Sequence, residues 1–215
     1  MQLIGQYDSG FVRRVGITLR HYGYPFTHHP HSVFRDAEHI AEHNPLLRVP
    51  TLVLDDGTVL VDSSVCIEVL DGRFAAAHGE DHPALLLPRS GLQREAGLRA
   101  CGFACGLLDK AVTLVYERLQ HPVAAPQWQA RCEHQLLATL SLLEQERQQQ
   151  STAFWLGAAL SHADIAITCA LTFVANAHPQ LLSRAPSLTA LRDLSGRCEA
   201  LPNFAAVYQP FVVHV

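Results

Sequence analysis

Two short polar strings place a hydroxyl group at the predicted start of a helix. Ser9 follows an apolar run and precedes helical periodicity, and Asp62-Ser63 stands in the same position before a later helix. The first N–H groups of a helix lie at the positive end of the backbone dipole, where a thiolate or a carboxylate is stabilised. Both strings also suit ordinary N-caps, each worth about 1 kcal/mol, which need no ligand. The pattern is compatible with binding of a small anionic molecule.

A third string, Arg48-Val49-Pro50, directly precedes an apolar run that is typical of a strand. Proline is ordinary as the first residue of a strand, because its missing N–H costs nothing there. If the bond between Val49 and Pro50 is cis, the N–H and C=O of Val49 are offered to an extended peptide ligand. The sequence leaves the isomer open.

A fourth string, Ser161-His162-Ala163-Asp164, has the spacing of a capping box before an apolar segment. A buried helix cannot satisfy its first amides with water. We therefore predict a structural role for Ser161 and Asp164 rather than a catalytic one.

The sequence contains 13 histidines, and histidine is a common metal ligand. On a strand, His29 and His31 would share a face, and His39 and His43 have helical spacing. No cysteine or carboxylate is spaced to complete a tetrahedral set around them. The sequence predicts solvated histidines and no metal.

The elements that must position these residues fall into two regions. The first is predicted as βαβαββα, and a tight Asp55-Asp56-Gly57-Thr58 connection indicates a hairpin within it. The predicted strands cover 2–7, 25–30, 51–54 and 59–61. The first predicted helix follows Gly10 and ends at Gly23, the second covers 36–43, and the third runs from 62 to 77. Periodicity lapses after His78, which indicates a linker. The predicted domains are 1–79 and 91–215, joined by the linker 80–90.

The second region carries only helical patterns, which predicts an all-α bundle. The segment 161–177 is apolar nearly all round, so it should lie in the middle of the bundle. The other predicted helices cover 92–119, 127–149, a stretch from Leu188 to Cys198, and a short terminal segment 204–211.

Composition narrows the class of protein. The formal charge is -4 with 16 Lys and Arg, and no basic stripe suits nucleic acid. The start of the sequence resembles no secretory signal, and the longest apolar stretch falls short of the ~20 residues of a membrane span. The six cysteines form no CxxC pair, which favours reduced thiols. We expect a globular cytoplasmic protein that binds neither membranes nor nucleic acid.

Taken in order, these strings resemble the glutathione S-transferase family along essentially the whole chain. The residues that carry the resemblance are 7–15, 44–52, 61–64 with Ile67-Glu68, and 161–165. The likeness is greatest to bacterial members with a serine at the first helix. The resemblance implies a thioredoxin-like first domain, a helical second domain, glutathione as co-substrate and a homodimer.

The family pattern also implies a role for each predicted site residue. Ser9 would donate a hydrogen bond to the glutathione sulfur, and Val49, before a cis Pro50, would pair its backbone with the cysteinyl part. The remaining contacts would come from Asp62 and Ser63 to the γ-glutamyl end and from Arg48 to the glycyl carboxylate.

The implied activity is attack of the glutathione thiolate on a small hydrophobic electrophile. The pocket for that electrophile would involve Phe11, Phe103, Leu107 and Tyr116. Tyr7 is a rival for Ser9, because other classes of the family use a tyrosine near the end of the first strand. The identity of the electrophile stays open.

Two other functions are weighed against the transferase. One is a binding or scaffold protein without useful catalysis, because a fold does not fix a function. The other is a glutathione-dependent disulfide reductase, which is weakened because position 9 is not a cysteine. The sequence does not identify the dimer interface.

Overall fold

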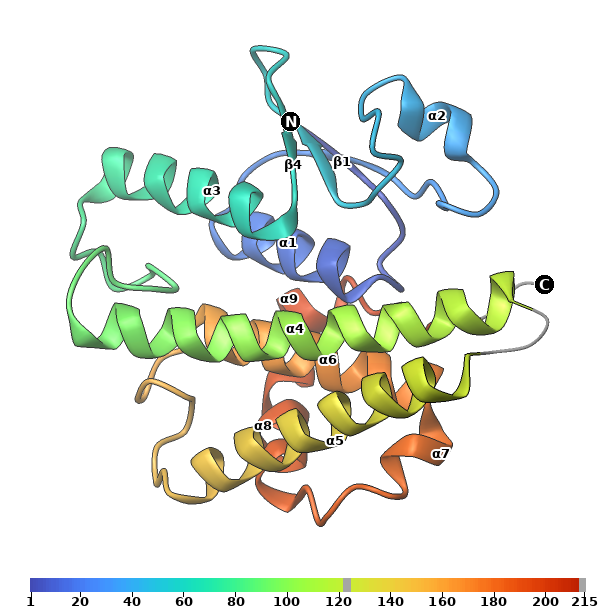
Figure 1. Cartoon of the computed structure of the whole chain (residues 1–215). Coiled ribbons are helices and arrows are strands. Elements are labelled where there is room, and N and C mark those ends of the chain that lie inside the picture. The colour runs from blue at the N-terminus through green and yellow to red at the C-terminus, as the bar shows by residue number, and fades with distance from the viewer. Residues whose placement is uncertain (122–124, 213–215) are drawn as a thin grey trace. The chain divides into compact units, whose positions relative to one another are not determined.

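The computed structural model describes residues 1–121 and 125–212 and divides the chain into two compact units (Figure 1). The first unit consists of Met1–Arg89 and Leu201–Pro210, and the second consists of Ser90–Ala200 and the segment that begins at Phe211. The sequence prediction placed 91–215 in one domain. The structure differs in grouping Leu201–Pro210 with the first unit.

The first unit contains a four-stranded mixed sheet, as predicted. Its strands are β1 (Gln2–Ile4), β2 (Thr27–His29), β3 (Thr51–Val53) and β4 (Val59–Val61). Their order is β2-β1-β3-β4, with β1 parallel to β2 and antiparallel to β3, and β3 antiparallel to β4. The sheet therefore has the thioredoxin-like arrangement that the family resemblance implies.

Helices cover both faces of this sheet (Figure 1). On one face, α1 (Gly10–His21) and α3 (Ser63–His78) pack on Leu3 and Leu52. On the other face, Ile40 of α2 (Ala37–Ala41) packs on Ile4 and Val53. Neighbouring strand residues divide between the two cores because side chains alternate across a sheet.

Gly5 ends β1 earlier than the prediction and brings three segments close together. Its φ of 126° lies in the region that favours glycine. A Cβ at this position would lie 2.6 Å from Cγ2 of Val12 and 2.7 Å from Cβ of Val49. The close approach sets the start of α1 beside the loop that precedes β3.

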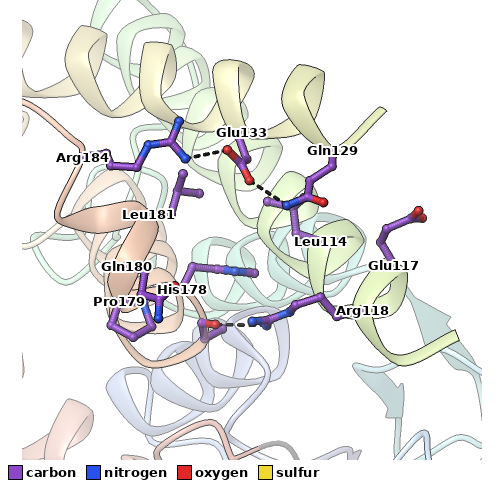
Figure 2. A pocket seen from close by; sticks show the side chains of 11 residues that line it. Leu114, Glu117, Arg118, Gln129, Glu133, His178, Pro179, Gln180, Leu181 and Arg184 are labelled. Atoms are coloured by element: carbon purple, nitrogen blue, oxygen red, sulfur yellow. Dashed lines mark hydrogen bonds and ion pairs between the residues drawn. The ribbon is translucent and has the colours of Figure 1, made fainter. Parts of the chain in front are cut away.

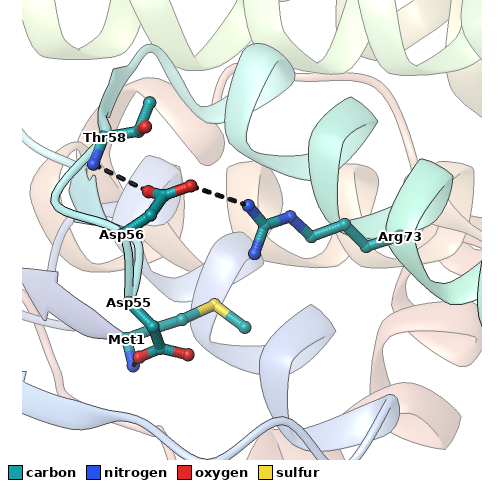
Figure 3. A network of polar contacts seen from close by, with 5 residues as sticks. All are labelled: Met1, Asp55, Asp56, Thr58 and Arg73. Atoms are coloured by element: carbon teal, nitrogen blue, oxygen red, sulfur yellow. Dashed lines mark hydrogen bonds and ion pairs between the residues drawn. The ribbon is translucent and has the colours of Figure 1, made fainter.

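The predicted hairpin between β3 and β4 is confirmed, and polar contacts fix it (Figure 3). The Thr58 N–H donates to Asp56 at 2.9 Å, and Arg73 of α3 lies 3.7 Å from the same carboxylate. The backbone hydrogen bond from Thr58 is the main reason that the pKa of Asp56 is lowered. The α-amino group of Met1 pairs with Asp55. These contacts connect the hairpin to β1 and α3.

The second unit is helical, as predicted, and α6 is its most buried element. Its helices are α4 (Leu92–Gln120), α5 (Pro126–Gln148), α6 (His162–Ala177), α7 (Pro179–Leu182) and α8 (Thr189–Glu199). Burial of α6 nearly all round, with α4 and α8 packed against it, confirms its predicted central position. The short helix α7 was not predicted.

The terminal helix lies earlier than predicted. The sequence indicated 204–211, whereas the structure has α9 at Pro202–Ala205, in the segment that belongs to the first unit. Pro202 suits the first helical position, because it has no N–H to leave unpaired. Pro210 disfavours helical geometry at the preceding residue, so the helix does not extend to 211.

None of the helices in the described ranges combines the length and hydropathy of a membrane span. The six cysteines all lie among the described residues and are thiols rather than disulfides. Burial raises the pKa of the Cys66 thiol to about 12 and that of Cys198 to about 12. These two thiols are protonated at neutral pH and therefore unreactive.

Candidate functional site

Ser9 is the N-cap of α1 and is only half-buried. Its Oγ accepts the N–H of Val12 at 3.5 Å, which is the long limit of a hydrogen bond. Within the described chain, this is the one hydrogen bond of the Ser9 hydroxyl. The hydroxyl hydrogen is therefore available to an acceptor at the positive end of the helix dipole.

Val49 stands in a loop that Asn44 holds in place. The buried Asn44 amide donates to the Arg48 carbonyl at 2.9 Å and to the Thr51 hydroxyl at 3.0 Å. The bond between Val49 and Pro50 is cis. Over residues 1–121 and 125–212, neither the N–H nor the C=O of Val49 makes a hydrogen bond. Its backbone can pair with an extended peptide.

The N-terminus of α3 is the third part of the site. The exposed Asp62 caps it by accepting the Ser64 N–H at 2.7 Å, while Ser63 is only 2% exposed. Arg14 of α1 donates to the hydroxyls of Ser63 and Ser64 at 3.2 and 3.3 Å. Its guanidinium places a positive charge beside a helix N-terminus, and the two together favour a carboxylate.

Arg14 was missed by the sequence analysis, although a signal for it existed. It is 3% exposed and adjacent to Arg13, which is 2% exposed, in a helix whose neighbouring positions are buried. Buried charges need polar partners. Two adjacent arginines within an apolar helical pattern therefore indicate a polar interaction with another segment.

These groups lie around the first half of α1. Ser9 and Arg14 are separated by about 7–8 Å along the helix. Gly5 meets both Val12 in the first turn and Val49 in the opposite loop. A tripeptide spans about 10 Å when extended. Ser9, the Val49 loop and Ser63 are thus each connected to the first half of α1, through the N-cap, Gly5 and Arg14.

Tyr7 points toward a different part of α1. Its ring stacks on His28 with centroids 4.0 Å apart, and a Cβ on Gly16 would lie 2.6 Å from Cε1 of Tyr7. Gly16 lies about 10 Å beyond Ser9 along the axis. Burial raises the pKa of the Tyr7 hydroxyl, although Arg20 partly opposes this. The Tyr7 ring thus lies away from the helix N-terminus.

The segment Leu201–Pro210 borders the loop that carries Ser9. The Tyr7 N–H donates to the Gln209 side chain at 3.1 Å, and Arg13 donates to the Phe204 carbonyl at 3.3 Å. The Arg13 guanidinium also lies 5.3 Å from the Tyr208 ring centroid. No local sequence signal predicts these contacts, because the partners are far apart in the chain.

The residues predicted to line the electrophile pocket differ in exposure and in the side of the helix from which they project. Phe11 is half-buried on α1. On α4, the Phe103 ring is exposed, and the Arg99 guanidinium lies 4.8 Å from its centroid. Leu107 is only 2% exposed. Tyr116 follows Leu107 by about two and a half turns, so the two project from opposite sides of the helix. The structure does not bring Leu107 and Tyr116 to one face of α4.

Ser161 and Asp164 form a capping box at the start of α6, in line with their expected structural role. Asp164 accepts the N–H groups of Ser161 at 2.9 Å and of Trp155 at 2.7 Å, and it is fully buried. Burial raises its pKa, while the hydrogen bonds act in the opposite direction. This carboxylate ties the preceding loop to the central helix.

Three histidines of the first unit, His29, His31 and His39, stack on one another. The His31 ring lies 6.0 Å from that of His29 and 4.9 Å from that of His39, measured between centroids. Within the described ranges, no group of three or more His, Cys, Asp or Glu side chains has a metal-binding arrangement.

Family comparisons match both units. Residues 3–78 match the glutathione S-transferase N-terminal domain, and residues 126–209 match the glutathione S-transferase C-terminal domain. The chain belongs to the glutathione S-transferase family. The first match includes Ser9, Val49, Asp62 and Ser63, and the second includes Ser161 and Asp164.

Solved members of the family share this fold over the whole chain. A glutathione S-transferase from Methylobacterium radiotolerans, in complex with glutathione sulfonate, is 26% identical with a TM-score of 0.83, covering 100% of this chain and 98% of its own. A glutathione transferase family member from Pseudomonas fluorescens Pf-5, with bound glutathione, is 25% identical with a TM-score of 0.78, covering 98% and 99%.

A curated relative matches over a shorter stretch. The GST-like protein YibF of Escherichia coli K12, whose activity is uncharacterized, is 30% identical over 118 residues. The match covers 55% of this chain and 55% of YibF, about half the length of each.

Proposed function

We propose that the protein binds glutathione in its first unit and activates the thiol for attack on small hydrophobic electrophiles. The observation that carries this proposal is the Ser9 hydroxyl at the N-terminus of α1, with one long hydrogen bond in the described chain. Support comes from two solved relatives, one with bound glutathione and one with glutathione sulfonate.

The remaining contacts follow from the chemistry of the tripeptide. The Val49 backbone, which makes no hydrogen bond within the described ranges, suits the cysteinyl segment, which is extended and carries its own N–H and C=O. Ser63, with Arg14 behind it, suits the α-carboxylate of the γ-glutamyl end, and Asp62 suits its ammonium group. Arg48 is exposed and suits the glycyl carboxylate.

Activation depends on the acidity of the bound thiol. A free thiol with a pKa near 8.5 is mostly protonated at neutral pH, and lowering the pKa by about two units takes ~3 kcal/mol of preferential thiolate binding. A hydrogen bond to a charged group contributes about 1.5–3 kcal/mol, and a helix N-terminus adds to it. A hydrogen bond from the Ser9 hydroxyl, together with the N-terminus of α1, is therefore sufficient to supply this free energy.

The chemical step is a substitution at carbon. With an activated aryl halide, the thiolate forms the new C–S bond, and the halide leaves with the electrons of the broken carbon–halogen bond. The thiol proton has already passed to solvent. The protein needs no redox change in this step.

A pair of hydroxyl deletions tests the role of Ser9. Ser9→Ala should raise the pKa of bound glutathione by about 1–2 units, read from the ultraviolet absorbance of the thiolate across pH, and should lower kcat/KM about 10- to 100-fold. Tyr7→Phe is the matched control and should change kcat/KM less than about threefold, because its ring lies along the later turns of α1. Full activity of Ser9→Ala would contradict the assignment.

Calorimetry separates catalysis from binding. Wild type and Ser9→Ala should bind glutathione with similar affinity, because the backbone and carboxylate contacts supply most of the binding. Binding without conjugation of any of several electrophiles would favour a scaffold protein. Absence of binding at millimolar glutathione would refute the proposal as a whole.

The alternative of disulfide reduction has a distinct requirement. That chemistry usually uses a protein thiolate in the site, and position 9 is a serine. A mixed-disulfide substrate would distinguish the two activities directly. Homodimer formation remains a prediction from the family pattern, and sedimentation equilibrium would test it. A cytoplasmic location remains a prediction from the sequence composition.

A further inference from the structure

A cavity of about 380 Å³ lies within the second unit, where α4 ends, α5 begins and α6 meets α7 (Figure 2). Its apolar wall includes Leu114, Ala177 and Leu181, and polar side chains project from all sides. None of the residues predicted to bind glutathione or its electrophile lines it. The cavity is large enough for a small organic molecule.

The two carboxylates that line this cavity are already engaged. Glu133 accepts from Arg184 at 2.7 Å and from Gln129 at 3.0 Å. Glu117 accepts the Ala125 N–H at 3.0 Å. Hydrogen bonds, from Gln129 first for Glu133 and from Ala125 first for Glu117, lower the pKa of both carboxyls. Both are therefore anionic at neutral pH and have protein partners.

Arg118 is the cation in the cavity that lacks a carboxylate partner. Its guanidinium donates to the Ala177 carbonyl at 3.1 Å, which holds it at the cavity wall. Over residues 1–121 and 125–212, no Asp or Glu lies within ion-pair distance of Arg118. Arg184, by contrast, is neutralised by Glu133. An arginine without a carboxylate partner favours an anionic ligand with planar geometry, such as a carboxylate.

His178 supplies a buried acceptor beside this cation. The residue is 7% exposed, and its Nε2 lies 2.8 Å from the Ala111 carbonyl. A carbonyl only accepts, so Nε2 carries the hydrogen and Nδ1 has a lone pair when the ring is neutral. In the described part of the chain, Nδ1 has no hydrogen-bond partner. Burial lowers the pKa of the ring, which keeps it neutral near pH 7.

We propose that this cavity binds a small hydroxycarboxylic acid with an apolar body. The carboxylate pairs with Arg118, the hydroxyl donates to Nδ1 of His178, and the apolar body packs on Leu114 and Leu181. A ligand without a negative charge leaves Arg118 unpaired, and one without a donor leaves the His178 acceptor unpaired. The cavity therefore selects for both groups together.

Calorimetric titration with 3- and 4-hydroxybenzoate tests the proposal. The two probes hold the carboxylate and hydroxyl at different separations, and saturating glutathione is present to occupy the proposed site in the first unit. At least one probe should bind, and benzoate should bind about fivefold more weakly because it lacks the donor. Arg118→Gln should weaken binding at least tenfold.

The matched control is Arg192→Gln, an exposed arginine of α8 that does not line the cavity. It should leave the affinity unchanged. Circular dichroism would verify that each variant is folded. Lack of binding by both probes at about 10 mM, roughly tenfold above a Kd of 1 mM, would overturn the proposal. Equal binding to Arg118→Gln and wild type would overturn it as well.

Discussion

The helix N-termini of the two units are satisfied in contrasting ways. In the first unit, the caps of α1 and α3 are local: the half-buried Ser9 and the exposed Asp62 each bind one backbone N–H. In the second unit, the buried Glu144 carboxylate accepts two N–H groups at the start of α8, and the buried Asp164 carboxylate accepts the N–H groups of the N-cap Ser161 and of Trp155 in the preceding loop. The starts of α1 and α3 thus depend on local side chains, whereas the start of α8 depends on a carboxylate from another helix.

The start of α8 illustrates the internal arrangement. Its N-cap is Leu188, which has no acceptor in its side chain. Glu144, which projects from α5, accepts the N–H groups of Ala190 at 3.0 Å and Leu191 at 2.9 Å. A carboxylate from a neighbouring helix thus replaces the local cap and joins two helices of the unit.

The largest expected effect is the loss of the Asp164 carboxylate. Asp164→Ala leaves the buried N–H groups of Trp155 and Ser161 unsatisfied, so the free energy of unfolding should fall by ~3–5 kcal/mol. Asp164→Asn keeps one acceptor oxygen and should lose about half as much. Urea denaturation measures both, and equal stability of Asp164→Ala and wild type would contradict the internal role.

Glu144→Gln should lower the free energy of unfolding by about 2 kcal/mol. The amide retains one oxygen for the start of α8 but loses the negative charge that faces the helix dipole. Glu146→Gln is the control on the same helix as Glu144. It removes an ion pair with Arg99 of α4 and should cost under ~1 kcal/mol. If the two variants are equally stable, the cap contributes nothing beyond an ordinary surface ion pair.

Ser63→Asp should place a permanent carboxylate at the start of α3. The new carboxylate would pair with Arg14 and occupy the position proposed for the γ-glutamyl carboxylate. Glutathione binding should weaken at least tenfold, about 1.4 kcal/mol, without a matching loss of stability. Ser63→Ala should weaken binding less. Unchanged affinity of Ser63→Asp, measured by calorimetry, would show that the carboxylate binds elsewhere.

The smallest effect concerns pH and the cap that Glu117 provides at the start of α5. Its folded-state pKa is lowered, mainly by the Ala125 N–H and then by His121, so its contribution to stability is present above the unfolded pKa near 4.3 and is lost as pH falls through the folded value. Glu117→Gln should be less stable than wild type at pH 7 and equal to it near pH 2. A difference that persists at acid pH would exclude the ionised carboxylate as its cause.

Local sequence signals were sufficient for most of the fold. Apolar runs and helical periodicity identified the succession of strands and long helices along the chain. The hairpin turn and the capping box of Ser161 and Asp164 were predictable because the residues of each are close together in the sequence. The short helix α7 has four residues, too few for periodicity to appear.

Contacts between distant segments were not predictable in the same way. Arg14 and Ser63 are 49 positions apart, and Tyr7 and Gln209 are 202 apart. Such pairs depend on the completed packing rather than on spacing. The predicted residues Ser63 and Tyr7 thus have hydrogen-bond partners that the sequence alone did not identify.

The grouping of Leu201–Pro210 with the first unit affects how the polypeptide can mature during synthesis. Translation proceeds from the N-terminus, so the carbonyl of Phe204 and the ring of Tyr208 reach Arg13 only after every helix of the second unit has been made. The sheet and its helices emerge first, yet their last supporting segment emerges almost at the end. A nascent chain stalled before residue 201 therefore carries a first unit that still exposes the Arg13 surface.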